Sequence, residues 1–236
     1  MKLLNIIILI VSLFTTDIFA QNASRTEQQR KLQLTEYSDH FEIFAEVMPF
    51  SINTQSDILA HFTYLDSFKP LERGEITLHL NIDGSVVSQK LLVPTKIGIY
   101  KFSMTPIKAG TGTLTFEIKT KDKIEKVVIT NITVFNNKRE AQLDANNKFI
   151  KHSKGIIYYK ERSWNVNFST AKAEIKNGKY IVVPQQAVIK QNGKMYVFLQ
   201  LHPELFIKQE IEATMKDQNS YIVYKGLQKG ERYVNK

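Results

Sequence analysis

The chain of 236 residues contains no cysteine. This absence excludes disulfides, thiolate metal sites and a cysteine nucleophile. It also excludes the lipid anchor of bacterial lipoproteins, which is attached to a cysteine at the cleavage site. Glycine and proline are sparse, at 10 and 6 residues, whereas phenylalanine and tyrosine number 14 and 10. Such a composition favours a folded chain over a disordered one.

Recognisable catalytic motifs are absent as well. No G-x-S-x-G element places a serine nucleophile on a sharp turn, and no H-E-x-x-H pair offers two histidines to a metal on one helix face. The run GTGT at 110–113 opens a strand and not a helix, so it indicates a turn instead of a phosphate-binding loop. We therefore predict that the chain is not an enzyme and has no catalytic or cofactor-binding residue.

The longest apolar run lies at the N-terminus, from Leu3 to Phe14, and follows a single lysine. It is shorter than the ~20 residues that a membrane-spanning helix needs. Residues 1–20 therefore indicate a secretory signal peptide cleaved after Ala20, and an uncleaved N-terminal anchor is the alternative. Residues 21–35 are polar and are interpreted as a mobile leader. Export of a cysteine-free chain indicates a bacterial periplasm.

Positive charge exceeds negative charge by nine. The lysines are scattered, and no nucleic-acid reader motif accompanies them, so we predict no nucleic-acid partner. A net positive charge favours solubility and attraction to anionic surfaces. An anionic membrane surface is therefore a candidate partner.

Alternating apolar and polar residues dominate residues 36–136. Period-two alternation is typical of strands with one buried face. About seven short strands are expected, at 41–47, 58–65, 76–82, 86–93, 99–104, 114–118 and 127–135. Asp83-Gly84 is a typical hairpin turn. These features predict an antiparallel β-sandwich of immunoglobulin-like character.

Residues 137–154 are polar and interrupt this rhythm, so they are interpreted as an interdomain linker with room for one helical turn. A smaller β-rich domain is predicted at 155–236. Hairpin turns are expected at Asn177-Gly178 and Asn192-Gly193. Its strands are expected at 156–159, 164–168, 179–183, 187–190, 195–201, 205–213, 221–224 and 233–234.

Histidine is the main candidate metal ligand. His40, His61 and His79 fall on strands that could be neighbours, and a cluster of them would suit a soft or borderline cation. Solvent-facing or hydrogen-bonded strand histidines are the favoured alternative. His152 and His202 show no metal-site spacing. We therefore assign no metal site, although a metal cation is kept as a candidate partner.

Other notable side chains have structural interpretations. Glu42 and Glu46 share a strand face that is expected to be solvated, and an acid–base pair is the disfavoured alternative. The single tryptophan, Trp164, is expected to bury its ring at the start of the second unit. Met104 and Met195 are expected to pack in or near the core.

The segment FEIFAEVMPFSINTQSDILAHFTYLDSFKPLERGEITLHL, at 41–80, contains a Glu-x-x-Pro strand end, an AHFT-x-L strand and an FKP-x-x-x-G loop. Further segments are GIYKFSMTPIKAGTGTLTFEI at 98–118, GIIYYKERSWNVNFSTA at 155–171, VPQQAVIKQNGKMYVFLQ at 183–200, and the GL-x-x-GE run at 226–231. In this combination and order, they resemble the periplasmic adaptor (membrane-fusion) subunits of resistance-nodulation-division efflux pumps, in the heavy-metal or cation branch.

One departure from the family is large. In full-length adaptors, a lipoyl domain, a long helical hairpin and a β-barrel lie between the tryptophan-containing segment and the Val-Pro strand. Here only residues 172–182 separate Ala171 from Val183. The resemblance therefore implies a short form that keeps both ends of an adaptor and lacks its core. The hairpin meets the outer-membrane channel in the family, so that role is not expected here.

The resemblance implies a periplasmic adaptor-like subunit of a cation efflux system that acts through protein–protein contacts. Expected partners are the inner-membrane pump, a full-length adaptor, or both. Residues 155–236 would correspond to the membrane-proximal domain of the family. The alternative is an exported β-sandwich binding module of the cell envelope with no role in efflux.

Overall fold

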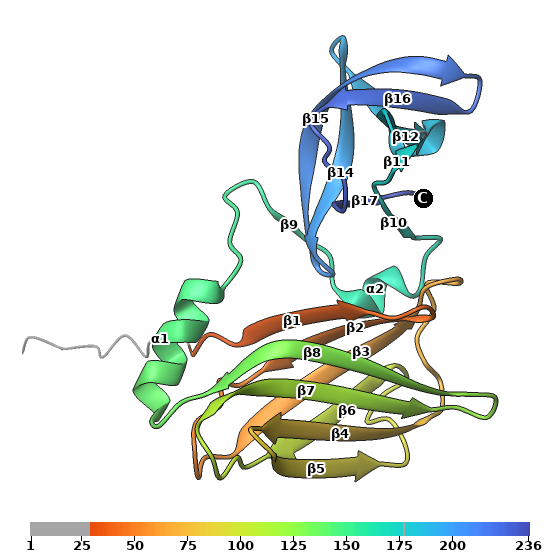
Figure 1. The fold of residues 1–236 in the computed structure, drawn as a ribbon. Coiled ribbons are helices and arrows are strands. Elements are labelled where there is room, and N and C mark those ends of the chain that lie inside the picture. The colour runs from red at the N-terminus through yellow and green to blue at the C-terminus, as the bar shows by residue number, and fades with distance from the viewer. Residues whose placement is uncertain (1–28, 177) are drawn as a thin grey trace, which may run out of the picture.

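The computed structural model describes residues 29–176 and 178–236. The chain is mainly β, as predicted, and forms a β-sandwich followed by a second β-rich unit (Figure 1). The predicted signal peptide at 1–20 lies outside the described residues, as does the larger part of the predicted leader at 21–35.

The sandwich consists of two four-stranded antiparallel sheets that pack face to face (Figure 1). Their strand orders are β1-β2-β3-β6 and β5-β4-β7-β8. The strands are β1 (Leu32–Tyr37), β2 (Phe41–Val47), β3 (Ser56–Tyr64), β4 (Glu75–Ile82), β5 (Ser85–Leu91), β6 (Ile99–Met104), β7 (Gly110–Lys119) and β8 (Ile124–Val134).

Aromatic rings fill the space between the two sheets. Phe62 and Phe102 from one sheet each meet Phe116 from the other, edge to face, with ring centroids 5.6 and 6.2 Å apart. All three side chains are fully buried, and this geometry is favoured by the ring quadrupoles. The period-two pattern of β4 places Ile76, Leu78 and the following apolar residues in the same core. The predicted core position of Met104 is also observed.

Truncation of Phe116 to alanine should lower the free energy of unfolding by about 3–5 kcal/mol, because it leaves a cavity among rings of both sheets. Val128→Ala is the control, since Val128 is a partly exposed residue of the neighbouring strand and should change stability by about 0.5 kcal/mol or less. Urea titration followed by circular dichroism measures both. Equal effects of the two substitutions would contradict this description of the core.

The sequence interpretation is corrected at both ends of the sandwich. The predicted leader at 21–35 ends earlier, because β1 begins at Leu32 and pairs with the whole of β2. The predicted linker at 137–154 contains helix α1 (Lys138–Lys148), which is longer than one turn. The side chain of Asn137 caps α1 by accepting from the Glu140 N–H at 3.0 Å. Ala141 and Ala145 of α1 are buried.

The second unit is one curved antiparallel sheet. Its main path runs β10-β17-β14-β15-β16-β12-β11, with β13 beside β14 and β9 beside β15. The elements are β9 (Ile156–Ile157), α2 (Lys160–Ser163), β10 (Thr170–Lys172), β11 (Ile175–Lys176), β12 (Tyr180–Pro184), the 3₁₀ turn η1 (Gln185–Ala187), β13 (Ile189–Gln191), β14 (Lys194–His202), β15 (Leu205–Asp217), β16 (Ser220–Lys225) and β17 (Arg232–Val234). Met195, predicted near the core, packs against the buried cluster of this unit.

Two predicted hairpin turns are present and have the expected backbone. Asp83 and Gly84 have φ values of 45° and 83° between β4 and β5, and Asn192 and Gly193 have values of 49° and 73° between β13 and β14. Asn177 of the third predicted turn is outside the described residues. The strand predictions at 156–159 and 164–168 are largely wrong: β9 covers only two residues of the first, and the second begins with turns and bends that follow α2.

Within residues 29–176 and 178–236, no helix combines the length and apolar character needed to cross a bilayer.

Candidate functional site

The two units meet where α2 and the residues after it lie on the outer face of the β1-β2-β3-β6 sheet (Figure 1). Strand β2 is consequently buried on both faces. Phe41 and Ile43 point into the sandwich core, whereas Glu42 and Phe44 are covered from the other side and are 1% exposed. We call this region the junction and define it by Glu42, Phe44, His61, Thr63, Lys160, Glu161, Trp164, His202 and Glu204.

Trp164 attaches the second unit to the sandwich. Its indole Nε1–H donates to Thr63 Oγ1 on β3 at 3.0 Å, and the ring is buried. Gly98 makes room for the ring, because a Cβ at Gly98 would lie 2.8 Å from Trp164 Cη2 and 2.5 Å from Pro70 Cβ. The φ of +75° at Gly98 independently favours glycine. The predicted burial of Trp164 is therefore observed, and the ring joins the two units.

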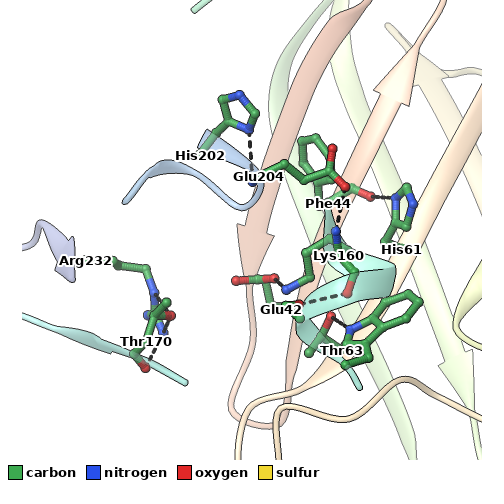
Figure 2. Close-up of polar contacts among 11 residues, drawn as sticks. Glu42, Phe44, His61, Thr63, Lys160, Thr170, His202, Glu204 and Arg232 are labelled. Atoms are coloured by element: carbon green, nitrogen blue, oxygen red, sulfur yellow. Dashed lines mark hydrogen bonds and ion pairs between the residues drawn. The ribbon is translucent and has the colours of Figure 1, made fainter. Parts of the chain in front are cut away.

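A buried ion pair lies beside the tryptophan. Lys160 Nζ of α2 is 2.5 Å from Glu42 Oε1 of β2, and both residues are 1% exposed (Figure 2). Among the described residues, Glu42 Oε2 has no hydrogen-bond partner. The prediction that Glu42 lies on a solvated face is thus wrong, because the second unit covers that face. Two buried charges are tolerated only when they neutralise each other at close range.

Glu204 fixes the start of α2 from a distant part of the chain. It lies in the turn between β14 and β15, and its Oε1 accepts the backbone N–H of Lys160 at 2.8 Å (Figure 2). The residue preceding the helix, Tyr159, provides no side-chain cap, so Glu204 satisfies one of the free N–H groups at the helix start. Removal from water raises the pKa of Glu204 to about 7.

Two histidines lie on either side of the Phe44 ring. The rings of His61 and His202 stack on it with centroid separations of 5.7 and 5.5 Å. Burial lowers the pKa of His61 and lowers that of His202 to about 4. His202 Nδ1 accepts the backbone N–H of Glu204 at 3.3 Å, and its Nε2 is 3.2 Å from the side-chain amide of Gln33. Both imidazoles are therefore neutral at pH 7.

A second contact between the units lies away from α2. The Arg232 guanidinium of β17 stacks over the Tyr37 ring of β1 at 4.4 Å and donates to Thr170 Oγ1 from Nη2 at 3.2 Å. Burial, and then the negative charge of Glu42, raises the pKa of the Tyr37 hydroxyl above its ordinary range. Tyr37 therefore stays neutral and supports the arginine as a stacking surface.

His61, Glu161 and Glu204 form one group of N and O donors. One ligand atom from each lies within 4.8 Å of the others. His61 and Glu204 are buried, and Glu161 is half exposed. The three residues come from β3, α2 and the β14–β15 turn, so the group exists only when the two units are docked.

The three histidines singled out in the sequence do not come together. His40 precedes β2, is exposed, and has its Nδ1 2.9 Å from Glu125 Oε2. His79 lies in the opposite sheet, where its Nδ1 is 2.7 Å from Ser88 Oγ. Only His61 belongs to the junction. Glu46, paired with Glu42 in the sequence interpretation, instead lies 3.5 Å from Lys31 Nζ and is partly exposed.

Sequence reasoning missed Lys160, Glu161, His202 and Glu204. Several of their contacts join residues more than 40 positions apart, such as Lys160 with Glu204 and Lys160 with Glu42. The one available signal was the position of Lys160 and Glu161 directly before the buried Trp164, in the segment KERSW.

Comparison with known families gives one match. Residues 181–236 match the family described as the CzcB C-terminal circularly permuted SH3-like domain. The match covers about a quarter of the chain and lies entirely in the second unit. It supports the predicted resemblance of that unit to heavy-metal efflux adaptors. Searches of curated proteins and of solved structures give no match.

Proposed function

We propose that this chain is a periplasmic adaptor-like component of a heavy-metal efflux system that acts through protein–protein contacts and without catalysis. The observation that carries the proposal is the match of residues 181–236 to the CzcB C-terminal domain. The ordered resemblance of residues 41–80 and 155–171 to the same class of adaptor supports it from the other end of the chain.

The arrangement of the two units suits such a role. The junction buries an ion pair, a tryptophan and a histidine between sandwich and second unit, so the two units are held in a fixed orientation. In the described part of the chain, the longest helix is α1, with 11 residues. A long helical hairpin for an outer-membrane channel is thus missing there. We infer that the partners are the inner-membrane pump, a full-length adaptor, or both.

The longest hairpin of the matched unit exposes a large side chain on each of its two faces. Met215 of β15 and Tyr224 of β16 are 56% and 64% exposed. The Tyr224 hydroxyl is 2.8 Å from Thr214 Oγ1, which fixes the ring on the hairpin. Exposed tyrosine and methionine are enriched in protein interfaces. We therefore propose that this hairpin contacts the efflux partner.

Copurification of the tagged full-length chain from cross-linked cells tests this proposal. The wild-type chain is expected to bring down an efflux pump or adaptor. The variant Met215→Ser/Tyr224→Ser should bring down several-fold less. Ile124→Ser removes a similarly exposed apolar side chain from the sandwich and is expected to behave like the wild type. Recovery of the wild-type chain without any efflux component would contradict the proposed function.

A binding module of the cell envelope without a role in efflux is the second candidate. The family match does not extend to the sandwich, and this observation favours the second candidate. The neighbouring genes distinguish the candidates. Genes for a pump and an outer-membrane channel are expected for an efflux component, and genes for polysaccharide synthesis or adhesion are expected for the alternative.

A further inference from the structure

We propose that the junction contains a binding site for one divalent transition-metal cation of the zinc type, with His61 Nε2 and the carboxylates of Glu161 and Glu204 as ligands. The three donors come from both units and lie within 4.8 Å of one another. The inference rests on the geometry of the junction and goes beyond the proposed efflux role.

The hydrogen bonding of His61 selects its ligand atom. His61 Nδ1 lies 3.4 Å from the backbone oxygen of Phe44 (Figure 2). A carbonyl can only accept, so Nδ1 carries the proton of the neutral ring and Nε2 carries the lone pair. A backbone carbonyl on one nitrogen commonly orients a histidine whose other nitrogen binds a metal.

The lone pair on His61 Nε2 faces a negative group. The nearest carboxylate oxygen, Glu161 Oε1, is 3.8 Å away, which is beyond hydrogen-bond distance. Among the described residues, Nε2 makes no hydrogen bond, although His61 is only 3% exposed. Two acceptor atoms that face each other repel, because neither can donate a proton. A cation between the two atoms would convert this repulsion into coordination.

The charge balance also favours a divalent cation. Glu161 and Glu204 offer two carboxylates to the group, and His61 adds one imidazole. The ammonium of Lys160, in the same junction, lies 2.5 Å from Glu42. Lys160 therefore cannot neutralise the pair fully. A charge of +2 would match the two carboxylates and reduce the cost of their burial.

The donor set indicates the type of metal. One imidazole nitrogen and two carboxylates suit zinc and similar borderline cations at about 2.0–2.2 Å from each ligand. Calcium and magnesium prefer sites made entirely of oxygen, and copper(I) prefers sulfur. Oε1 of Glu204 is already oriented by the Lys160 N–H, whereas the half-exposed side chain of Glu161 can move to complete the site.

Two of the three proposed ligands are accessible from solvent. Glu204, His202 and Tyr159 line an open groove of about 440 Å³ between the start of β1 and the second unit. Glu161 opens to solvent on its own side. A cation can therefore approach the group through Glu204 or through Glu161.

Calorimetric titration of the full-length chain with zinc chloride, after treatment with a chelator, tests the proposal. One equivalent of zinc is expected to bind. Glu161→Gln should weaken binding about tenfold or more, and this half-exposed position should tolerate the change without unfolding. His40→Gln is the matched control, because His40 is exposed and lies next to Glu125 outside the junction.

Thermal unfolding provides a second readout. Zinc should raise the unfolding temperature of the wild type and of His40→Gln, because it binds only the docked state. The shift should be absent in Glu161→Gln. Equal zinc affinity of the wild type and Glu161→Gln, or no stoichiometric binding by a folded wild type, would overturn the proposal. Either result would leave the proposed efflux role untouched, since that role rests on the family match and on copurification.

Discussion

Replacement of Lys160 with methionine is expected to lower the free energy of unfolding by about 3–5 kcal/mol, because it leaves the Glu42 carboxylate buried without a counterion. Lys160 Nζ lies 2.5 Å from Glu42 Oε1, and both residues are 1% exposed. Methionine is an unbranched side chain of similar length, so the packing at this position changes little. Urea denaturation followed by circular dichroism measures the loss.

The double variant Glu42→Gln/Lys160→Met separates charge from packing. It removes both buried charges, so it should recover most of the stability lost in the single variant, because neutral groups can replace a buried ion pair at little cost. Lys225→Met is a surface control, since Lys225 pairs with Glu212 in solvent, and it should cost at most about 1 kcal/mol. A loss at Lys160 as small as that at Lys225 would contradict the buried pair.

Replacement of Trp164 with alanine is expected to cost about 3–5 kcal/mol and to weaken the docking of the second unit. The ring fills the space between Gly98, Pro70 and His61, and it is the largest side chain in the junction. The wild type should unfold in one transition followed by circular dichroism. The alanine variant should unfold in two, because the units lose their main apolar contact.

Trp164→Phe is the matched control. It keeps an aromatic ring but loses the indole N–H that donates to Thr63, so a cost of about 1–3 kcal/mol is expected from the unpaired hydroxyl and the smaller ring. Its unfolding should remain a single transition. Identical single transitions for wild type and Trp164→Ala would show that the tryptophan does not couple the units.

Local pattern was sufficient for most strands and turns. The strand at 99–104 and the Asp83-Gly84 and Asn192-Gly193 turns are found where they were predicted, because alternation and positive φ are determined by neighbouring residues. Helix α1 was missed because it buries only the small side chains of Ala141 and Ala145, which produce no visible apolar stripe. Strand β1 was missed because its polar residues pair with β2 at the sheet edge.

The junction could not be predicted from such patterns. The alternation in β2 was interpreted as one buried and one solvated face, which places Glu42 in water. The second unit covers that face and supplies Lys160 as the counterion, from a position 118 residues later. His61 shows the same effect, since the ring that looked like an ordinary strand histidine stacks on Phe44 and approaches Glu161. Contacts of this range depend on how the two units dock.

Growth of a strain that lacks this chain, in graded concentrations of zinc, copper and cobalt salts, tests the proposed role in heavy-metal efflux directly. A role in heavy-metal efflux predicts increased sensitivity to at least one of these metals, and restoration of tolerance by the wild-type chain expressed from a plasmid. Unchanged growth of the deletion strain at every concentration of all three metals would contradict it.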